Sequence, residues 1–320
     1  MIIVVTDDAP GIVAASTLGH KLRDLGELRV FDSQVNSESL LIERLAGADV
    51  AITVAGSNFT EAVLKECPQL QHIAVFGIGV DNVDLDACRK RGVTVSNTPA
   101  YSAAIVAEKA IALALAVAHQ IPQLDRAVRS GEWPQEIVGQ LHGKILGVIG
   151  TGPIGQHVIL LGRSLGMEVL AWTLNPSPQR AREYQVIFVP MEELLGRADV
   201  VSLQLPLSSL SANLIGPKQL GLMKPSAILV NVGRGAVVDE QALVDALKGG
   251  RIGGAGLDVF STEPLPLGHP FRNLDNVVMS PHNAANTPEA NQAGLAIAIQ
   301  NIDDWQQGLA TNLREREFTQ

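Results

Sequence analysis

The chain has 320 residues, twice the ~150 typical of one domain, so its length predicts two domains with substantial cores and excludes a small disulfide-stapled scaffold. Hydrophobic residues make up 46 % and charged residues 18 %, which excludes a disordered, collagen-like or coiled-coil chain. The net charge of -9, without any run of Lys and Arg, argues against nucleic acid and anionic membranes as partners.

The chain also carries signals of its location. The N-terminus, MIIVVTDD, lacks a basic region and a long apolar segment, and therefore predicts a first strand rather than a signal peptide. The most apolar stretch, residues 110–118, is less than half of the ~20 residues that a membrane span needs. We therefore expect a cytoplasmic protein. Cys67 and Cys88 are too few and too far apart for a metal cage, so we expect free thiols and no metal site.

Short β-branched runs alternate with helical patterns from the start of the chain. This alternation predicts a parallel sheet covered by helices on both faces. In the first third of the chain the predicted strands are residues 2–6, 28–31, 50–54 and 72–76.

The same alternation resumes after residue 144. Two doubly wound sheets are favoured over a single one of eleven strands, because open sheets rarely exceed ~10 strands. The sequence therefore predicts an α/β protein with two parallel-sheet domains. The strands predicted for the second sheet are residues 145–149, 168–172, 186–189, 200–203, 227–230, 254–257 and 277–279.

Two helices are predicted from their end signals. Ser102 is the expected N-cap of an Ala-rich helix over residues 102–119, whose small side chains would let another helix approach closely. That approach could occur between domains or between subunits, and the sequence favours neither. Near the end of the chain, Thr287 can cap and Pro288 can open a helix with apolar positions at helical spacing, namely Leu295, Ile299, Ile302 and Trp305.

A glycine motif, GTGPIG at residues 150–155, directly follows the predicted strand 145–149 and precedes a predicted helix over 156–165. In such a motif one glycine makes a tight turn, one lets the backbone approach a pyrophosphate, and one allows close packing of helix on strand. The helix N-terminus favours the negative charge. Three glycines can also form a simple turn, but the position between strand and helix predicts dinucleotide binding.

The next strand ends at Thr173, where an acidic residue would grip the ribose 2′-hydroxyl of NAD. Without that carboxylate the 2′-phosphate of NADP is not repelled, and Arg180 and Arg182 lie a few residues further on. The cofactor is therefore NAD or NADP. The two arginines either favour NADP or are ordinary solvated helix residues.

Three later segments, each after a predicted strand, are rich in functional side chains. They are NVGRG at 231–235, DVFSTEP at 258–264 and SPHNAA at 280–285. Loops at the carboxyl ends of strands line the ligand crevice in open α/β sheets. We therefore expect Arg234, Glu263 and His282 to converge.

Together these segments resemble the D-isomer-specific 2-hydroxyacid dehydrogenase family, which includes glyoxylate and hydroxypyruvate reductases, D-lactate dehydrogenases and phosphoglycerate dehydrogenases. The resemblance covers nearly the whole chain. Further matching motifs are FGIGVDNVD at 76–84, NTP at 97–99, VAE at 106–108, LHGK at 141–144 and LPL at 205–207.

The chain departs from the family pattern at three positions. Thr173 stands where the family often has Asp, which bears on the cofactor. Gln204 stands where it often has His, and Asn286 where some members have Trp, and both differences bear on the substrate.

The resemblance implies catalytic roles for three residues. Arg234 would bind the carboxylate and carbonyl oxygen of the substrate, His282 would be the general acid/base, and Glu263 would pair with His282. Elementary chemistry agrees, because imidazole titrates near neutral pH and a carboxylate stabilises imidazolium. A planar guanidinium also matches a carboxylate in a way that lysine cannot.

The resemblance also implies ligand contacts. Backbone amides of Gly77, Ile78 and Gly79 would bind the substrate carboxylate, with an ordinary turn as the alternative; Arg234 and His282 also belong to this substrate site. The residues implied along the cofactor are Gly150, Gly152, Pro153, Ile154, Gly155, Thr173, Leu205, Pro206, Val232, Gly233, Arg234, Asp258, His282 and Ala285.

In the family pattern, residues 1–96 and 285–320 would form a flavodoxin-like substrate-binding domain and residues 97–284 a dinucleotide-binding Rossmann domain. A homodimer through the Ala-rich helix is also implied. The expected activity is NAD(P)H-dependent reduction of a small 2-keto acid such as glyoxylate or hydroxypyruvate, reversed on D-2-hydroxy acids. The alternatives are a D-3-phosphoglycerate dehydrogenase of serine synthesis and a non-catalytic, NAD(H)-sensing protein like the co-repressors built on this fold.

Overall fold

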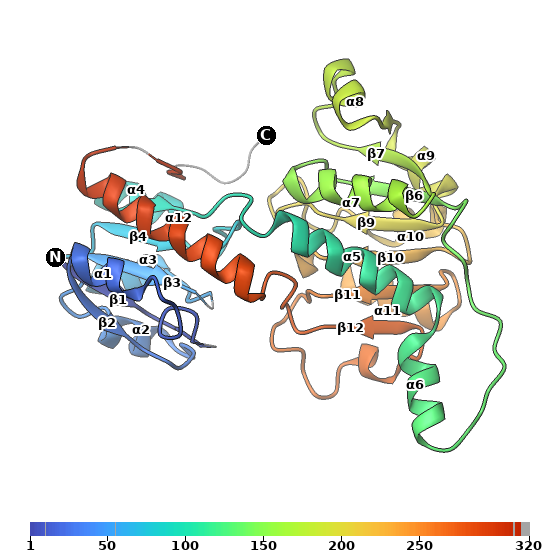
Figure 1. Ribbon diagram of the computed structural model, residues 1–320, viewed down its shortest axis with the longest axis horizontal. Coiled ribbons are helices and arrows are strands. Elements are labelled where there is room, and N and C mark those ends of the chain that lie inside the picture. The colour runs from blue at the N-terminus through green and yellow to red at the C-terminus, as the bar shows by residue number, and fades with distance from the viewer. Residues whose placement is uncertain (10, 55, 310, 315–320) are drawn as a thin grey trace. The chain divides into compact units, whose positions relative to one another are not determined.

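The structure is a computed structural model that describes residues 1–9, 11–54, 56–309 and 311–314 (Figure 1). The chain divides into two compact units: Met1–Tyr101 with the described residues from Asn286 on, and Ser102–Ala285. The first division therefore falls after Tyr101, where the sequence predicted it after residue 96. The reason is that Asn97 is held in the first unit, where its carbonyl accepts a hydrogen bond from Asn301 Nδ2 at 2.8 Å.

The first unit contains a parallel sheet with the strand order β2-β1-β3-β4-β5. This is the flavodoxin-like order that the family resemblance implied. All four predicted strands are present within one residue at each end, but the short strand β5 escaped prediction. The strands are β1 (Ile2–Val5), β2 (Glu27–Val30), β3 (Val50–Thr53), β4 (His72–Val75) and β5 (Thr94–Ser96).

Helices cover both faces of this first sheet. On one face, α1 (Gly19–Leu25) and α12 (Pro288–Gln306) pack against β1, β3 and β4. The other face is covered by α2 (Glu38–Arg44), α3 (Glu61–Glu66) and α4 (Leu85–Arg91). The predicted start of α12 is confirmed, since Thr287 Oγ1 accepts a hydrogen bond from Ala290 N at 3.2 Å and Pro288 is the first helical residue.

The second unit contains a seven-stranded parallel sheet with the order β12-β11-β10-β9-β6-β7-β8. The order reverses between β6 and β9, which makes their carboxyl ends the expected ligand crevice. The predicted strand at 186–189 is reduced to two residues. The strands are β6 (Ile145–Ile149), β7 (Glu168–Trp172), β8 (Ile187–Phe188), β9 (Val200–Leu203), β10 (Ile228–Asn231), β11 (Gly254–Leu257) and β12 (Val277–Met279).

Two helices, α5 (Ala103–Ala118) and α7 (Pro153–Ser164), lie side by side on one face of this sheet (Figure 1). The opposite face is covered by α9 (Met191–Arg197), α10 (Pro217–Leu222) and α11 (Glu240–Lys248). The remaining helical segments are α6 (Ile121–Arg129), α8 (Pro178–Tyr184), η1 (Gly235–Val237) and η2 (Pro270–Asn273).

The Ala-rich helix α5 is packed inside the second unit. Its small side chains let it approach the sheet so closely that a Cβ added to Gly256 of β11 would lie 2.8 Å from Leu113 Cβ. Ser102 occupies the predicted N-cap position, although its side chain makes no capping hydrogen bond. Within the described residues no single helix could cross a membrane; by length and composition alone, the pair α5 and α6 could, with a 59° bend between them.

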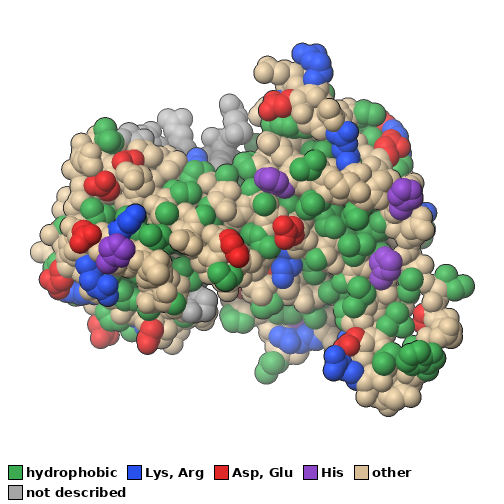
Figure 2. All heavy atoms as spheres, viewed as in Figure 1, with side chains coloured by type: hydrophobic (Ala, Val, Ile, Leu, Met, Phe, Trp, Pro, Cys, Tyr) green, Lys and Arg blue, Asp and Glu red, His purple; other side chains and the backbone are tan. Residues whose placement is uncertain are grey.

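Apolar side chains are exposed on α6 and on the segment that follows it. No residue of α6 is buried, and the side chains of Ile121 and Val128 are about half exposed. In the following segment Trp133 is 78 % exposed and Ile137 is 95 % exposed. Figure 2 shows hydrophobic atoms on the surface in this part of the second unit, at the lower right of the view.

The first unit contains one buried histidine. His72 Nδ1 lies 2.8 Å from Thr94 Oγ1, its Nε2 lies 2.9 Å from Ser96 Oγ, and its ring stacks on Trp305 at 5.2 Å. Burial lowers the pKa of His72 to about 4, so the ring is neutral at pH 7. This neutral side chain connects β4, β5 and α12, which is a structural role.

Cys67 and Cys88 are free and buried. The free thiols are as predicted, and burial raises the pKa of the Cys88 thiol to about 12, so it is a poor nucleophile. Within the described part of the chain, no group of three or more His, Cys, Asp or Glu side chains could hold a metal ion.

Candidate functional site

The glycine motif lies at the carboxyl end of β6, where the strand order reverses. Gly150 has a φ of +99°, a left-handed conformation that favours glycine. Helix α7 begins at Pro153 with Gly152 as its N-cap, so the predicted start at residue 156 is wrong. Proline suits the first position because the N–H it lacks has no partner in a helix. The earlier start brings the first turn of α7 directly into the glycine motif.

The glycines leave room for a phosphate group. A Cβ at Gly155 would collide with the carbonyl oxygen of Gly150, so this glycine lets the helix pack on the turn. A Cβ at Gly152 would meet no atom within 4 Å, so the space beside it is open. The N–H groups of the first turn of α7, which include those of Ile154 and Gly155, have no acceptor within the helix. Such a helix start favours an anion.

A second feature at the switch point also indicates a ligand. Gln204 directly follows β9 and is 9 % exposed, and its buried Oε1 has no hydrogen-bond partner among the described residues. Its Nε2 donates to Ser202 Oγ. A buried amide oxygen without a partner is rare and indicates a ligand or a water molecule. The open space, the helix start and this amide together fit a bound dinucleotide.

The end of β7 carries Thr173, which is half-buried, and not a carboxylate. Arg180, on α8, lies over the glycine motif. Its Nη2 donates to Thr151 O at 3.2 Å and to Thr151 Oγ1 at 3.1 Å, and its Nη1 donates to Asn175 O at 3.1 Å. Arg182 is exposed. Of the two arginines that the sequence singled out, the structure therefore brings only Arg180 to the motif.

The loops after β9 and β10 are in backbone contact. A Cβ at Gly233 would lie 2.7 Å from Leu205 O, so only glycine lets these loops approach so closely. Val232 is buried in the cluster that α5 and α7 form on the sheet, whereas Pro206 is exposed.

Arg234 belongs to a turn that Asn231 builds. The Asn231 side chain accepts a hydrogen bond from Gly233 N at 3.0 Å and donates one to Arg234 O at 2.9 Å. Arg234 Nη1 also donates to Gly233 O at 3.0 Å. The guanidinium is therefore oriented in part by its own turn.

His282 and Glu263 form the pair that the sequence predicted. His282 Nδ1 lies 2.6 Å from Glu263 Oε2, the length of a charge-assisted hydrogen bond. The other carboxylate oxygen, Glu263 Oε1, accepts a hydrogen bond from Phe260 N at 2.8 Å. Because the carboxylate accepts at Nδ1, this nitrogen carries the proton, and Nε2 is left for other partners.

Asp258 builds the turn that presents His282. This fully buried carboxylate accepts hydrogen bonds from Ser280 Oγ at 2.6 Å, from Asn283 N at 3.2 Å and from Ala284 N at 3.0 Å. The carbonyl oxygen of Asp258 accepts from His282 N at 2.7 Å. His282 itself has a φ of +50°, which is uncommon for a residue other than glycine. The strain is tolerated because Asp258 fixes both sides of the turn.

Electrostatics keep Glu263 charged. Burial is the largest single effect, and it raises the pKa of the Glu263 carboxyl. This rise is outweighed by the hydrogen bond with His282 and the charge of His282, and by the Phe260 amide and the charge of Arg234. Together they bring the pKa of Glu263 below its usual value. The turn that carries Arg234 lies against the loop that leads to Glu263, because a Cβ at Gly235 would collide with backbone atoms of Phe260. Arg234, Glu263 and His282 are thus brought together within the second unit.

The predicted substrate amides lie in the first unit, directly after β4. The Gly77 amide donates to Thr98 Oγ1 at 2.9 Å. No hydrogen bond joins the Ile78 or Gly79 amide to another described residue.

Several residues that shape the site were not predicted in this role. Asn231 orients the Arg234 turn, Ser280 bonds to Asp258, and Lys109 Nζ donates to Asn283 Oδ1 at 3.1 Å. Ala285, which the resemblance had placed along the cofactor, is half-buried at the end of the second unit. For Asn231 the signal was present, because an amide at the end of a strand can bond to its own loop. The other contacts cross between elements and have no local pattern.

Comparison with known proteins gives a consistent result. The model of the family described as "D-isomer specific 2-hydroxyacid dehydrogenase, NAD binding domain" matches residues 111–284. A glyoxylate reductase of Thermococcus litoralis is 38 % identical over 280 residues, which are 85 % of this chain and 84 % of that protein. A D-3-phosphoglycerate dehydrogenase of Methanocaldococcus jannaschii is also 38 % identical, over 88 % of this chain but 54 % of its own length.

Two solved structures resemble the whole chain. An acyclic imino acid reductase in complex with NADPH and D-Arg is 30 % identical, with a TM-score of 0.87 over 98 % of this chain and 100 % of that one. A D-lactate dehydrogenase from Aquifex aeolicus in complex with NAD and lactic acid is 27 % identical, with a TM-score of 0.87 over 99 % of both chains.

The open space beside Gly152 predicts how a substitution there changes the affinity for the cofactor. Gly152→Ala should leave the melting temperature unchanged but weaken NAD(P)H binding at least about tenfold, because the methyl group enters the space expected for the pyrophosphate. Fluorescence titration of the bound nucleotide measures the affinity. The control is Gly155→Ala, which should cost about 1–3 kcal/mol of unfolding free energy through its backbone collision. Wild-type affinity in Gly152→Ala would contradict the assignment.

Proposed function

The chain belongs to the D-isomer-specific 2-hydroxyacid dehydrogenases, NAD(P)-dependent oxidoreductases that act on CH–OH groups, and we propose that it reduces small 2-keto acids of the glyoxylate or hydroxypyruvate type. In reverse it would oxidise D-2-hydroxy acids. The observation that carries this proposal is the 2.6 Å contact between His282 Nδ1 and Glu263 Oε2, close to Arg234.

The proposed chemistry assigns one task to each side chain. Bound NAD(P)H supplies the hydride for the carbonyl carbon. Protonated His282 keeps its Nδ1–H on Glu263 and gives its Nε2 proton to the carbonyl oxygen, which becomes the hydroxyl. Glu263 stabilises the imidazolium through the short hydrogen bond. In the reverse direction, neutral His282 accepts the hydroxyl proton at Nε2.

Arg234 would bind the substrate carboxylate. Its guanidinium offers two parallel N–H donors, which match the two oxygens of a carboxylate. The family resemblance adds the amides of Gly77, Ile78 and Gly79 as further ligands, of which the Gly77 amide donates to Thr98 Oγ1 in this structure. The cofactor residues predicted from the glycine motif, and Leu205, Pro206, Val232, Gly233, Asp258 and Ala285, remain proposals in that role.

Oxidation of D-3-phosphoglycerate is the second candidate, since a similar relative carries that name. Glyoxylate or hydroxypyruvate is preferred because the sequence has no clearly placed set of basic residues for a substrate phosphate. A measurement of turnover distinguishes the proposed enzyme from a non-catalytic, NAD(H)-sensing protein, because only the enzyme turns over its substrate.

The two units would bind different ligands. We assign dinucleotide binding to Ser102–Ala285, which contains the segment matched by the NAD-binding family model, and substrate binding to the other unit. A homodimer is also proposed, now through the exposed apolar side chains of α6 and the following segment, including Trp133 and Ile137. The tight packing of α5 within its own unit argues against that helix as the principal contact. A cytoplasmic location stays a prediction.

The activity is tested with glyoxylate, hydroxypyruvate, pyruvate and, in reverse, D-3-phosphoglycerate, each with both cofactors. We expect the highest kcat/KM for glyoxylate or hydroxypyruvate. His282→Ala should lower kcat by ~10²- to 10⁴-fold, because the proton donor is lost. The matched control is His20→Ala, an exposed histidine of α1.

Other outcomes of the activity test would contradict different parts of the proposal. A preference for D-3-phosphoglycerate would replace the proposed substrate with the second candidate. Nucleotide binding without any turnover would favour the sensing role. Full activity of His282→Ala would contradict the proton-transfer role of His282.

We further propose that NADPH is the preferred cofactor. Thr173 brings no negative charge to the end of β7, and Arg180 brings a positive charge to the glycine motif through Thr151. The Tyr184 ring lies 5.7 Å from the Arg180 guanidinium and limits its movement. A guanidinium held in this way can accommodate a 2′-phosphate.

The cofactor proposal predicts a selective loss. Arg180→Ala should raise the dissociation constant of NADPH about 10- to 100-fold and that of NADH much less, because only NADPH has the 2′-phosphate. Titration of both nucleotides measures this difference. Arg182→Ala, which removes an exposed arginine of the same helix, is the control. A strong preference of the wild-type protein for NADH would refute the proposal.

A further inference from the structure

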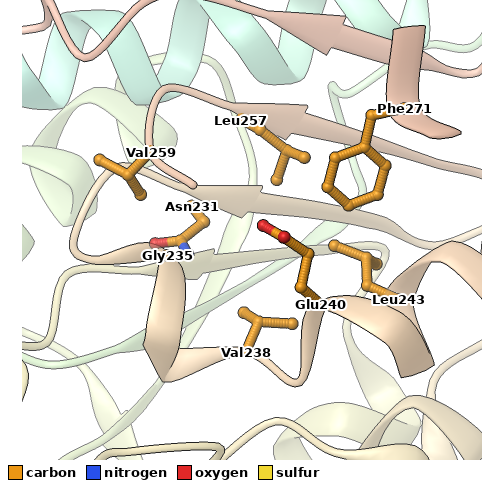
Figure 3. A pocket seen from close by; sticks show the side chains of 8 residues that line it. All are labelled: Asn231, Gly235, Val238, Glu240, Leu243, Leu257, Val259 and Phe271. Atoms are coloured by element: carbon orange, nitrogen blue, oxygen red, sulfur yellow. The ribbon is translucent and has the colours of Figure 1, made fainter. Parts of the chain in front are cut away.

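A second carboxylate–imidazole pair lies next to the loop that carries Glu263. Glu240 is the first residue of α11, and its Oε1 lies 3.2 Å from His269 Nε2. Its Oε2 accepts a hydrogen bond from Ser261 N at 2.9 Å. Figure 3 shows the Glu240 side chain directed into a small cavity that Asn231, Gly235 and Phe271 help to line. This cavity has a volume of about 10 Å³. Glu240 thus contacts the loop from the side of α11.

His269 holds Glu240 in this position. His269 Nδ1 accepts a hydrogen bond from Phe271 N at 3.3 Å, so the ring proton lies on Nε2 and is donated to Glu240 Oε1. The His269 ring packs on Phe271 with 4.7 Å between centroids, and Phe271 packs on Phe260 at 6.5 Å. The side chains of Glu240 and His269 are 21 % and 15 % exposed, so this pair is better shielded than His282 and Glu263.

The contact of Glu240 with the Ser261 amide lies next to the peptide that binds Glu263. Ser261 follows Phe260, whose amide donates to Glu263 Oε1, so the two bonded amides are neighbours along the chain. Gly235 also lies against this peptide, because a Cβ there would collide with Phe260 and Ser261 backbone atoms. The loop therefore contacts both the Arg234 turn and Glu240.

We propose that Glu240, supported by His269, is a positioning residue that fixes the Ser261 amide and thereby directs Glu263 toward His282. Removing its carboxylate lets the loop move, and the 2.6 Å contact of Glu263 with His282 is lost. The effect on rate rests on the proposed function, but the effect on His282 does not.

A purely structural role makes a different prediction. A carboxylate in the first turn of a helix also stabilises that helix through the helix dipole. In that case Glu240 would affect the stability of α11 and nothing at His282. Glu240→Asp separates the two roles, since it keeps the charge at the helix start but withdraws the acceptor from Ser261.

The test uses the full chain without substrate or cofactor. In ¹⁵N-labelled protein at a pH where the ring is neutral, the nitrogen shifts of His282 report its tautomer, and the signal is assigned by its loss in His282→Ala. We expect the Nδ1–H tautomer in the wild type and in Glu240→Gln, which keeps an acceptor for Ser261. Glu240→Ala and Glu240→Asp should shift the ring toward the Nε2–H form. The control is Gln241→Ala, an exposed residue of the same helix.

Kinetics give the second readout. Relative to the wild type, kcat for 2-keto acid reduction should fall at least about tenfold in Glu240→Ala and Glu240→Asp, and stay within about threefold in Glu240→Gln and Gln241→Ala. An unchanged His282 tautomer in the Asp variant would overturn the proposal, even if Glu240→Ala fails to fold. Absence of turnover in the wild type would instead refute the proposed function and leave the tautomer result valid.

Discussion

The candidate site depends on one short hydrogen bond, the 2.6 Å contact between His282 Nδ1 and Glu263 Oε2. It fixes which ring nitrogen carries the proton and leaves Nε2 for the substrate oxygen. His282 makes this bond from a left-handed backbone conformation, with a φ of +50°, that costs roughly 1–2 kcal/mol for such a residue. Hydrogen bonds to the buried carboxylate of Asp258 offset this cost.

The parallel sheet of the second unit explains why these groups meet. Its strands all point the same way, so the loops after β6, β9, β10, β11 and β12 gather at one edge. Glycines at positions 155, 233 and 235 let these loops touch backbone to backbone, where any side chain would collide. The helix start beside Gly152 and the turn of Arg234 are therefore parts of one packed edge. The same edge would bring the nicotinamide cofactor and the acid/base pair together.

Much of this could be predicted from the sequence because it has local causes. Buried parallel strands are continuous β-branched runs, so most strands were predicted within one residue, and Thr287 with Pro288 marked the start of α12 correctly. The strand β5 was missed because three residues carry no periodicity. The predicted start of α7 is too late because glycines favour loops, whereas Gly152 and Pro153 here form the N-terminus of the helix.

The functional residues also divide into those that a local sequence pattern reveals and those that it does not. Arg234, Glu263 and His282 were found through ordered motifs, and the structure brings these three together. Three other contacts could not be predicted from the sequence. They are the hydrogen bonds of Asp258 to the turn at 280–284, the bond of the Gly77 amide to Thr98, and the contact of Glu240 with Ser261. Each joins segments that are distant in sequence, and such tertiary hydrogen bonds have no characteristic spacing.

The most direct test of the central claim is the pH dependence of kcat/KM for the wild-type enzyme in both directions, between about pH 5 and 8, where histidine changes its charge. If His282 is the proton donor and acceptor, kcat/KM for keto acid reduction falls as the pH rises, and kcat/KM for hydroxy acid oxidation rises over the same interval. Trends in the opposite directions, or flat profiles in both, would contradict the account.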